Sequence, residues 1–497
     1  MDQEIIQIIL GMKIGQLRQD MGISLKELSA RTGTSVSYLN EIEKGKKYPK
    51  VDKMLTLAKA LEVTYEELIS PKLDGNLNPL ASVLQSPMMR KFPFHIFKTS
   101  ARELVQLMTG HPREMGILAR MLSELGRSYD IRMEQFFHTA MRCHQMIHNN
   151  FFPELEDKAA ACRKRQRWDP EVIPNYPQLT QALEKDFGIK VDEDNLLRQK
   201  QELAGLRSVL LPKRGQLWLN DRLSRAQRSF AVGKELGYAN LGITKRTFSS
   251  PALHIEEFSQ VYDNFRASYF AGALLIPKQR FQRDIKSIFK QTRWNGGKAI
   301  LQLLSDYGVT PETFLYRWSE LIPHCFKTRQ VHFMKFTRQR HETRIDLNKQ
   351  LNMSRVHIPN GLGLNEHFCR RWLSLSLINQ LEAQGGDEPI IDAQRSKFLG
   401  YGTEFFCITI AYPGTMRPDM IASVTLGFPV DKALKNTIRF WSDDEIPYRE
   451  LGQTCERCPL EQGQCSVRQA DADLFREEER LAARKRALEE LVSSQAG

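Results

Sequence analysis

The sequence predicts a multidomain protein that is mainly α-helical and has an α+β C-terminal part. Its 497 residues correspond to about three or four compact units. Apolar residues recur at helical spacing in the N-terminal third, and short apolar runs that favour strands follow after residue 170. The hydrophobic content of 41% and the charged content of 26% are ordinary for a globular protein and exclude wholesale disorder.

The charge and the number of cysteines limit which partners and which cellular compartment are expected. The 71 Lys and Arg residues outnumber the 59 Asp and Glu residues, and the formal charge of +12 suggests a polyanionic partner without naming one. The longest apolar stretches, such as 270–277, are shorter than the roughly 18 to 20 residues of a membrane helix. The chain starts with acidic residues, unlike a signal peptide. We therefore expect a cytoplasmic protein with reduced cysteines and no membrane partner.

Composition and turn formers divide the chain into six segments. The predicted segments are a helical module at 1–70, a linker at 71–79, a helical region at 80–165, a mixed α/β region at 166–325, a strand-containing α/β domain at 326–470 and a charged helix at 471–497. The strand candidates, each a short apolar run, are 208–211, 216–219, 405–412 and 421–428.

The first segment carries the signals of a compact set of short helices. Residues 24–27 and 64–67 both have the capping-box form, in which the first and fourth residues satisfy each other's free amide hydrogens. Gly22, Gly33 and Gly45 supply helix stops. Leucines at helical spacing lie between these signals, so the segment is expected to fold around one small core.

This segment resembles the helix-turn-helix of the Cro and cI repressor family, also called the xenobiotic-response-element (XRE) class. The resemblance covers nearly all of residues 13–69. The matching runs are 14–18, 24–28, 33–45 and Pro49. The resemblance implies a five-helix DNA-binding domain with an internal ion pair between Arg18 and Glu43.

The predicted recognition helix is capped by Ser35 and turns Leu39 and Ile42 inward. Its other face carries side chains that suit base edges: Asn pairs with adenine, Val contacts a thymine methyl, Glu accepts from cytosine and Ser contacts several bases. Lysines just past the helix end suit phosphates, which position the protein without reading sequence. The predicted DNA-contacting residues are Ser35, Val36, Ser37, Asn40, Glu41, Lys44, Lys46 and Lys47.

Two stretches of the fourth segment, 229–241 and 265–277, resemble the zinc-binding helices of the ImmA and IrrE metallopeptidase-like domains. Active relatives have a His-Glu-x-x-His helix, which places two imidazoles on one face for zinc and uses the Glu as general base. A second helix carries the third, acidic ligand. In this chain the corresponding residues are Lys234, Glu235, Tyr238 and Arg266.

Protonated lysine and arginine side chains donate hydrogen bonds but cannot ligate a cation. The resemblance therefore implies a degenerate peptidase-like domain with no catalytic residues, and we expect a protein that is not an enzyme. Two interpretations of this region stay open, a remodelled binding pocket and an inert helical core.

Three cysteines near the C-terminus are spaced for a metal centre. Cys455, Cys458 and Cys465 form C-x2-C-x6-C, in which the first two thiolates chelate one centre and the third closes around it. A 4Fe–4S cluster needs a fourth thiolate. The alternative is a structural zinc site completed by His367 or Cys369. The other cysteines are expected to be small core hydrophobes, namely Cys143, Cys162, Cys325 and Cys407.

The region from about 360 to 470, with Cys369 near Trp372 and the cysteine triplet, looks like the C-terminal domain of short-chain fatty acyl regulators. These bacterial transcription factors join the same helix-turn-helix to the same degenerate peptidase-like region. The resemblance implies Cys369 as fourth metal ligand, a 4Fe–4S cluster, a short-chain acyl-CoA effector, and control of acetate, propionate or glyoxylate metabolism. The spacing from Cys458 to Cys465 is longer than in the family, and the residues around Cys369 differ from its usual form.

An acyl-CoA effector would need cationic groups for its phosphates and an apolar pocket for its acyl chain. The sequence has no Gly-rich phosphate motif, so no cofactor-binding residue is assigned. The basic residues considered for this role are Arg338, Arg340, Arg344, Arg370 and Arg371.

The sequence thus predicts a cytoplasmic transcription regulator that senses a metabolite and binds a double-stranded DNA operator. We expect a homodimer, because one helix-turn-helix covers only one half-site. Two other functions stay open. One is a zinc metallopeptidase that cleaves a repressor, which Lys234, Tyr238 and Arg266 disfavour. The other is a regulator that acts through protein partners.

Overall fold

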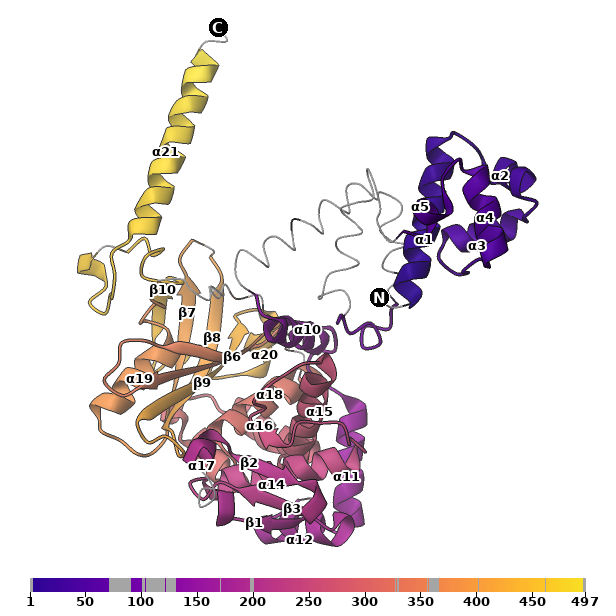
Figure 1. Ribbon diagram of the computed structural model, residues 1–497. Helices are drawn as coiled ribbons and strands as arrows, with labels where there is room; N and C mark the ends of the chain where they lie inside the picture. The colour runs from indigo at the N-terminus through magenta and orange to yellow at the C-terminus, as the bar shows by residue number, and fades with distance from the viewer. Residues whose placement is uncertain are drawn as a thin grey trace. The chain divides into compact units, whose positions relative to one another are not determined.

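Figure 1 shows the computed structural model, which divides into two units. One unit comprises residues 1–144 and 255–258, and the other comprises 145–254 and 259–497. The structure describes residues 3–70, 91–100, 103, 121, 131–169, 171–196, 201–326, 328, 330–354, 356, 366–400, 402–460 and 462–494. The predicted linker at 71–79 and most of the region from 80 to 130 lie outside the described residues. No helix among the described residues is long and apolar enough to cross a membrane.

The first unit begins with five helices. These are α1 (Gln3–Asp20), α2 (Leu25–Thr32), α3 (Val36–Glu43), α4 (Val51–Ala60) and α5 (Tyr65–Ile69). Both predicted capping boxes are present, at Ser24 with Glu27 and at Thr64 with Glu67. The helices enclose one core, built from Leu10, Ile14, Leu28, Leu39, Ile42, Met54, Leu57, Ala58, Leu61 and Leu68. The expected five-helix fold of this segment is confirmed.

A glycine sets how closely α1 and α3 pack. A Cβ added at Gly11 would lie 2.2 Å from the carbonyl oxygen of Ile42, so only glycine fits without movement of one helix. Gly45 follows α3 with φ 63°, a left-handed conformation that glycine adopts without strain. These contacts fix the position of α3 against the domain core.

Helix α10 (Met133–Ile147) precedes the helical part of the second unit. That part contains α11 (Pro153–Arg165), α12 (Tyr176–Phe187), α14 (Arg225–Asn240), α15 (Phe258–Leu275), α16 (Lys278–Phe289), α17 (Lys298–Tyr307) and α18 (Pro311–Cys325). A small sheet lies among them in the order β1-β3-β2-β4, from β1 (Lys190–Asp192), β2 (Ser208–Leu211), β3 (Gln216–Leu219) and β4 (Ser249–Ser250). The predicted strands at 208–211 and 216–219 are confirmed.

The C-terminal part of this unit is built on a six-stranded sheet in the order β10-β7-β8-β9-β5-β6. Its strands are β5 (His332–Gln339), β6 (Asp346–Asn352), β7 (Ile390–Phe398), β8 (Glu404–Pro413), β9 (Met420–Pro429) and β10 (Tyr448–Leu451). All neighbouring strands are antiparallel except β10 and β7. The remaining helices are α19 (Leu373–Ala383), α20 (Lys432–Thr437) and α21 (Asp473–Ser494).

Both faces of the central strands are covered. Phe406, Ile408 and Ile410 of β8 share a core with α18, while Phe405 and Cys407 share a core with α19. This alternation follows the two-residue period of a strand and explains the continuous apolar run. The predicted strands at 405–412 and 421–428 are confirmed as β8 and β9.

The larger core of the second unit extends from Phe152 in the chain to Ile446. It joins α11, the peptidase-like helices and one face of the C-terminal sheet. The predicted segment boundaries near 165 and 325 therefore fall between parts that share a hydrophobic core. The predicted charged helix is present as α21, whose described side chains are largely exposed.

Candidate DNA-recognition helix and remodelled peptidase-like centre

Helix α3 presents the predicted DNA-contacting side chains. The Oγ of Ser35 accepts a hydrogen bond from the amide of Tyr38 at 3.3 Å and caps the helix, as predicted. Leu39 and Ile42 are fully buried, whereas Val36 is 38% exposed. The other predicted contact residues of this segment are also accessible: Ser35 and Ser37 are exposed, and Asn40 and Glu41 are half-buried.

The predicted phosphate-contacting lysines, Lys44, Lys46 and Lys47, are exposed directly after α3. The carbonyl oxygen of Glu41 accepts from the amides of Lys46 at 2.8 Å and Lys47 at 3.3 Å. These bonds hold the lysine segment against the end of the helix. The lysines therefore have a defined position beside the exposed face of α3.

The ion pair implied by the repressor resemblance is present. Arg18 donates from Nε and Nη2 to the two carboxylate oxygens of Glu43 at 2.7 and 3.0 Å, and to the carbonyl of Ile23 at 2.9 Å. The hydrogen bond with Glu43 raises the pKa of Arg18. This pair joins α1 to the end of α3 and has a structural role.

The peptidase-like centre lies where α14 crosses α15. A Cβ added at Gly237 would lie 2.7 Å from the carbonyl oxygen of Ala267, so glycine permits this close crossing. Helix α14 carries Lys234, Glu235 and Tyr238, and α15 carries Arg266. The sequence-predicted remnants of the zinc site are therefore on the two expected helices.

Arg246 contacts two of these residues, Glu235 and Tyr238. Its guanidinium forms a fork with Glu235, in which Nη1 donates to Oε1 at 3.0 Å and Nη2 donates to Oε2. The same guanidinium lies 4.0 Å from the centre of the Tyr238 ring. Both oxygens of the carboxylate at the general-base position are thus engaged by a cation. Arg246 lies outside the resembling stretches and was not among the residues predicted from sequence.

The other two substituted positions differ in their surroundings. Arg266 pairs with Asp263 one turn away on α15, at 3.3 Å, and lies over the ring of Tyr262. Lys234 is half-buried beside Tyr238. Burial, with smaller contributions from Arg207 and Arg246 and against the charge of Glu235, lowers the pKa of Lys234 to about 8. The structure therefore gathers cationic side chains where an active peptidase would hold a metal cation.

The four predicted metal-ligating cysteines are all buried. Cys369 is close enough to Cys455 and Cys458 for their charges to interact, and Cys458 is close enough to Cys465. The amide of Cys455 donates to the carbonyl of His367 at 2.8 Å, and the amide of Cys369 donates to that of Gln453 at 3.1 Å. Burial, with smaller contributions from Cys458 and Cys455, raises the pKa of the Cys369 thiol to about 11. Burial also raises the pKa of Cys458, to which Cys465 and Cys455 add.

One buried cation, Arg370, lies beside these thiols and opposes the effect of their burial. Arg370 is buried and donates from Nη2 to the carbonyl of Thr343 at 2.8 Å, while its Nη1 has no hydrogen-bond partner among the described residues. Its guanidinium is close enough to Cys455 and Cys369 for their charges to interact. A buried, partly unsatisfied cation beside thiols favours thiolates or a negatively charged metal–thiolate group. Across the described residues, however, no three His, Cys, Asp or Glu side chains are arranged to hold a metal ion.

His367 has a different partner from the cysteines. Its Nδ1 lies 2.8 Å from Oε1 of Glu456, and its backbone amide donates to the same carboxylate. Cys369 is therefore the better placed of the two candidate fourth ligands. Of the four cysteines expected in the core, Cys162 and Cys407 are buried and Cys325 is half-buried against the core. The expectation for Cys143 was wrong, because its position on α10 leaves it exposed.

Four of the five arginines considered for an effector are engaged by the protein, the exception being the partly unsatisfied Arg370. Arg338 pairs with Glu382 and Asn379, and Arg371 donates to backbone carbonyls of Glu450 and Gln464. Arg344 pairs with Asp346, and Arg340 lies 3.8 Å from Asp387. These contacts are structural and provide no common phosphate site.

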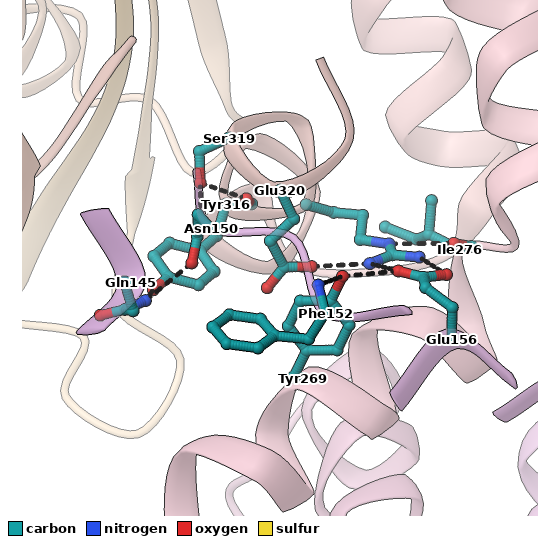
Figure 2. A network of polar contacts seen from close by, with 10 residues as sticks. Gln145, Asn150, Phe152, Glu156, Tyr269, Ile276, Tyr316, Ser319 and Glu320 are labelled. Atoms are coloured by element: carbon teal, nitrogen blue, oxygen red, sulfur yellow. Dashed lines mark hydrogen bonds and ion pairs between the residues drawn. The ribbon is translucent and has the colours of Figure 1, made fainter. Parts of the chain in front are cut away.

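A buried polar network in the second unit was also missed from sequence (Figure 2). Arg317 of α18 donates to Glu156 and Glu320 at 2.8 Å each and to the carbonyl of Ile276 at 3.1 Å. The Tyr269 hydroxyl donates to Glu156 at 2.7 Å. Sequence showed Arg317 and Glu320 only as a helical i, i+3 pair, which is usually exposed.

Comparisons with known proteins agree with this organisation. The family model described as Helix-turn-helix matches residues 14–68, and the model described as IrrE N-terminal-like domain matches residues 184–319. The uncharacterized HTH-type transcriptional regulator y4dJ of Sinorhizobium fredii (strain NBRC 101917 / NGR234) is 36% identical over 63 residues, which are 13% of this chain and 82% of that protein. A Mycobacterium tuberculosis transcriptional regulator of known structure covers 66% of this chain and 93% of its own, at 18% identity and a TM-score of 0.46. The chain therefore belongs to the family of helix-turn-helix transcriptional regulators.

Proposed function

We propose that this protein is a sequence-specific, homodimeric regulator of bacterial central carbon metabolism that acts in the cytoplasm. The exposed face of α3 supports operator binding, because polar side chains that suit base edges lie beside exposed lysines that suit phosphates. A two-fold dimer would place two such helices on successive half-sites about one helical turn apart. The resemblance to short-chain fatty acyl regulators is the basis for acetate, propionate or glyoxylate metabolism and for a short-chain acyl-CoA effector.

Operator binding is tested by comparing specific with random DNA. Asn40→Ala combined with Lys44→Ala is expected to abolish the preference for operator DNA while the circular dichroism spectrum stays unchanged. Lys59→Ala is the matched control, because Lys59 is an exposed lysine of α4 outside the proposed contact set. Unchanged specificity in the double variant would refute α3 as the reading helix and favour a regulator that acts through protein partners.

We further propose that the C-terminal part senses metabolic or redox state through a metal centre on Cys369, Cys455, Cys458 and Cys465. A 4Fe–4S cluster is the first candidate and structural zinc is the alternative. Such a cluster would supply one-electron redox chemistry, while the buried Arg370 guanidinium would offset the negative charge of the thiolates.

The metal proposal is tested by measuring iron, acid-labile sulfide and zinc in protein purified without oxygen. About four irons and four sulfides per chain, absent from a variant lacking the cysteine triplet, would support the cluster. About one zinc and no iron would support the structural alternative. Protein without bound metal would refute both.

We also propose that the protein has no peptidase activity. Lys234, Tyr238 and Arg266 replace the metal ligands, and Arg246 engages both oxygens of Glu235. The expected result is that Glu235→Gln and added zinc leave the stability of the intact chain and of candidate repressor substrates unchanged. Zinc-dependent cleavage that disappears in Glu235→Gln would revive the metallopeptidase alternative.

A further inference from the structure

The remodelled peptidase-like centre contains more positive charge than its own acidic groups neutralise. Among the described residues, Glu235 is the one carboxylate whose charge acts on Lys234, and Arg246 already engages both of its oxygens. Arg207 and Arg246 both lie close enough to repel the Lys234 ammonium. Among the described residues, neither the Lys234 ammonium nor the Arg207 guanidinium forms a hydrogen bond or an ion pair.

This arrangement is costly for the unliganded protein. An ammonium group removed from water loses solvation free energy that only a countercharge or hydrogen bonds restore. At Lys234 the ring of Tyr238, 5.8 Å away, gives a weak cation–π contact. Burial is also the leading cause of the lowered pKa of Lys234, because removal from water disfavours the charged ammonium.

The cationic centre borders the C-terminal sheet. Arg207 also acts on Glu312 at the start of α18 and on Tyr412 of β8. Glu312 accepts from Lys335 at 2.6 Å and from Lys349 at 3.5 Å, so that carboxylate is already neutralised by β5 and β6. The Thr415 hydroxyl, after β8, donates to Gln227 of α14 at 2.6 Å. Residues of the peptidase-like helices and of the sheet thus meet at this centre.

We propose that Lys234 and Arg207, backed by Arg246, form a binding site for the carboxylate or phosphate group of a small anionic metabolite. The side chains of Arg246 and Glu235 are only 6% and 8% exposed, whereas Arg207 is exposed, so the inner part of the centre suits a small anion entering from the Arg207 side. A bound oxyanion would supply the countercharge that Lys234 and Arg207 lack and would accept their hydrogen bonds. In this site cationic side chains stand where an active peptidase holds its metal cation, and the bound ligand is an anion.

Because α14 and the C-terminal sheet both contribute to its surroundings, occupancy of the site is expected to couple these two parts. This inference deepens the proposed metabolite sensing and rests on it only for its biological meaning. Anion binding is measured on the protein alone, without DNA. Failure of operator binding would therefore refute the proposed function without affecting this site. Failure of anion binding would refute this site without affecting operator binding.

The test uses the full chain in calorimetry and thermal unfolding with sodium phosphate, sodium acetate and coenzyme A, each compared with sodium chloride at equal ionic strength. At least one oxyanion is expected to bind and to raise the Tm. Phosphate and coenzyme A binding without acetate binding would assign the site to phosphate groups, and acetate binding without phosphate binding would assign it to carboxylates.

Three variants complete the experiment. Lys234→Met is expected to fold, because it removes a desolvated charge and has a side chain of similar length. It is expected to bind the anion at least tenfold more weakly. Arg207→Gln, at an exposed residue, is expected to weaken binding without a change in Tm. Lys190→Met is the control, because Lys190 is an exposed lysine that pairs with Glu184. Failure of all three oxyanions to bind, or wild-type affinity in both Lys234→Met and Arg207→Gln, would overturn the proposal.

Discussion

The Arg246 guanidinium engages both carboxylate oxygens of Glu235, the residue that would act as general base in a related active peptidase. A water molecule activated by this carboxylate would compete with the charge-assisted hydrogen bonds that Arg246 donates to both oxygens. The pair is also almost fully shielded from solvent. Substitution of the metal ligands and engagement of the base are therefore two separate obstacles to hydrolysis.

The Glu235–Arg246 pair should be strongly coupled. Removing one partner of a buried ion pair leaves an uncompensated charge, which typically costs about 3–5 kcal/mol. We expect Arg246→Met to lower the free energy of unfolding by that order in urea titrations. The double variant Glu235→Gln with Arg246→Met is expected to recover at least half of the loss, because neither buried charge remains. A cost below about 0.5 kcal/mol for Arg246→Met, the range of ordinary surface substitutions, would contradict this view.

The crossing of α14 and α15 gives a matched pair of glycine substitutions. An alanine Cβ at Gly237 would lie 2.7 Å from the Ala267 carbonyl oxygen and 3.0 Å from its Cα, so the helices must separate. We expect Gly237→Ala to destabilise the protein by about 1–3 kcal/mol, as overpacking does. At Gly233 the nearest atom would be the Ala271 Cβ at 3.4 Å, an ordinary contact.

Gly233→Ala is the control for this prediction. In a helix interior, alanine is favoured over glycine by about 1 kcal/mol, so this variant should be neutral or slightly stabilising. Thermal unfolding of the two variants should therefore move Tm in different directions or by clearly different amounts. Equal losses in both would show that the close crossing is not what requires Gly237.

The recognition helix predicts two distinct effects on DNA binding. Lys46→Ala with Lys47→Ala is expected to weaken specific and random DNA alike and to reduce the slope of log K against log salt by about 2, because two phosphate contacts are lost. Asn40→Ala is expected to weaken operator DNA by about 1–3 kcal/mol and to leave random DNA unchanged. Fluorescence anisotropy at several salt concentrations separates the two. A salt slope that does not change in the lysine variant would remove these lysines from the interface.

Local sequence patterns predicted many of the helices and strands. The contacts that they did not predict are between residues far apart in the chain. The capping boxes at Ser24 and Thr64 and the alternating apolar run of β8 are determined by near neighbours, and the structure matches them. Arg246 could not be assigned to Glu235, because the contact depends on the path of the chain after α14. The contact of Arg317 with Glu156 could not be assigned from sequence, because the two residues are 161 positions apart. The partners of Arg338 and Arg371 likewise come from other elements, so the sequence did not show these contacts.

The two carboxylates on Arg317 should respond differently to pH (Figure 2). Burial tends to raise the pKa of Glu156, but the charge and hydrogen bond of Arg317 prevail and lower it. At Glu320 burial prevails over Arg317 and, with the nearby Glu156, raises the pKa from 4.5 to about 7, while Lys349 acts weakly in the opposite direction. In the window from pH 4.5 to 7, the folded state therefore holds more protons at Glu320 than the unfolded state.

It follows that Glu320 lowers the stability of the protein progressively as pH rises through that window. Glu320→Gln cannot ionise, so its stability relative to wild type should increase between pH 4.5 and 7.5, by up to about 3 kcal/mol if the full shift is expressed. Glu156→Gln is the matched control: it removes the ionised partner of Arg317 and should destabilise the protein at pH 7.5 by about 3–5 kcal/mol. Urea unfolding of the three proteins at both pH values measures these differences. If the gap between Glu320→Gln and wild type is independent of pH, Glu320 is ionised throughout, and Arg317 is neutralised by two charged carboxylates instead of one.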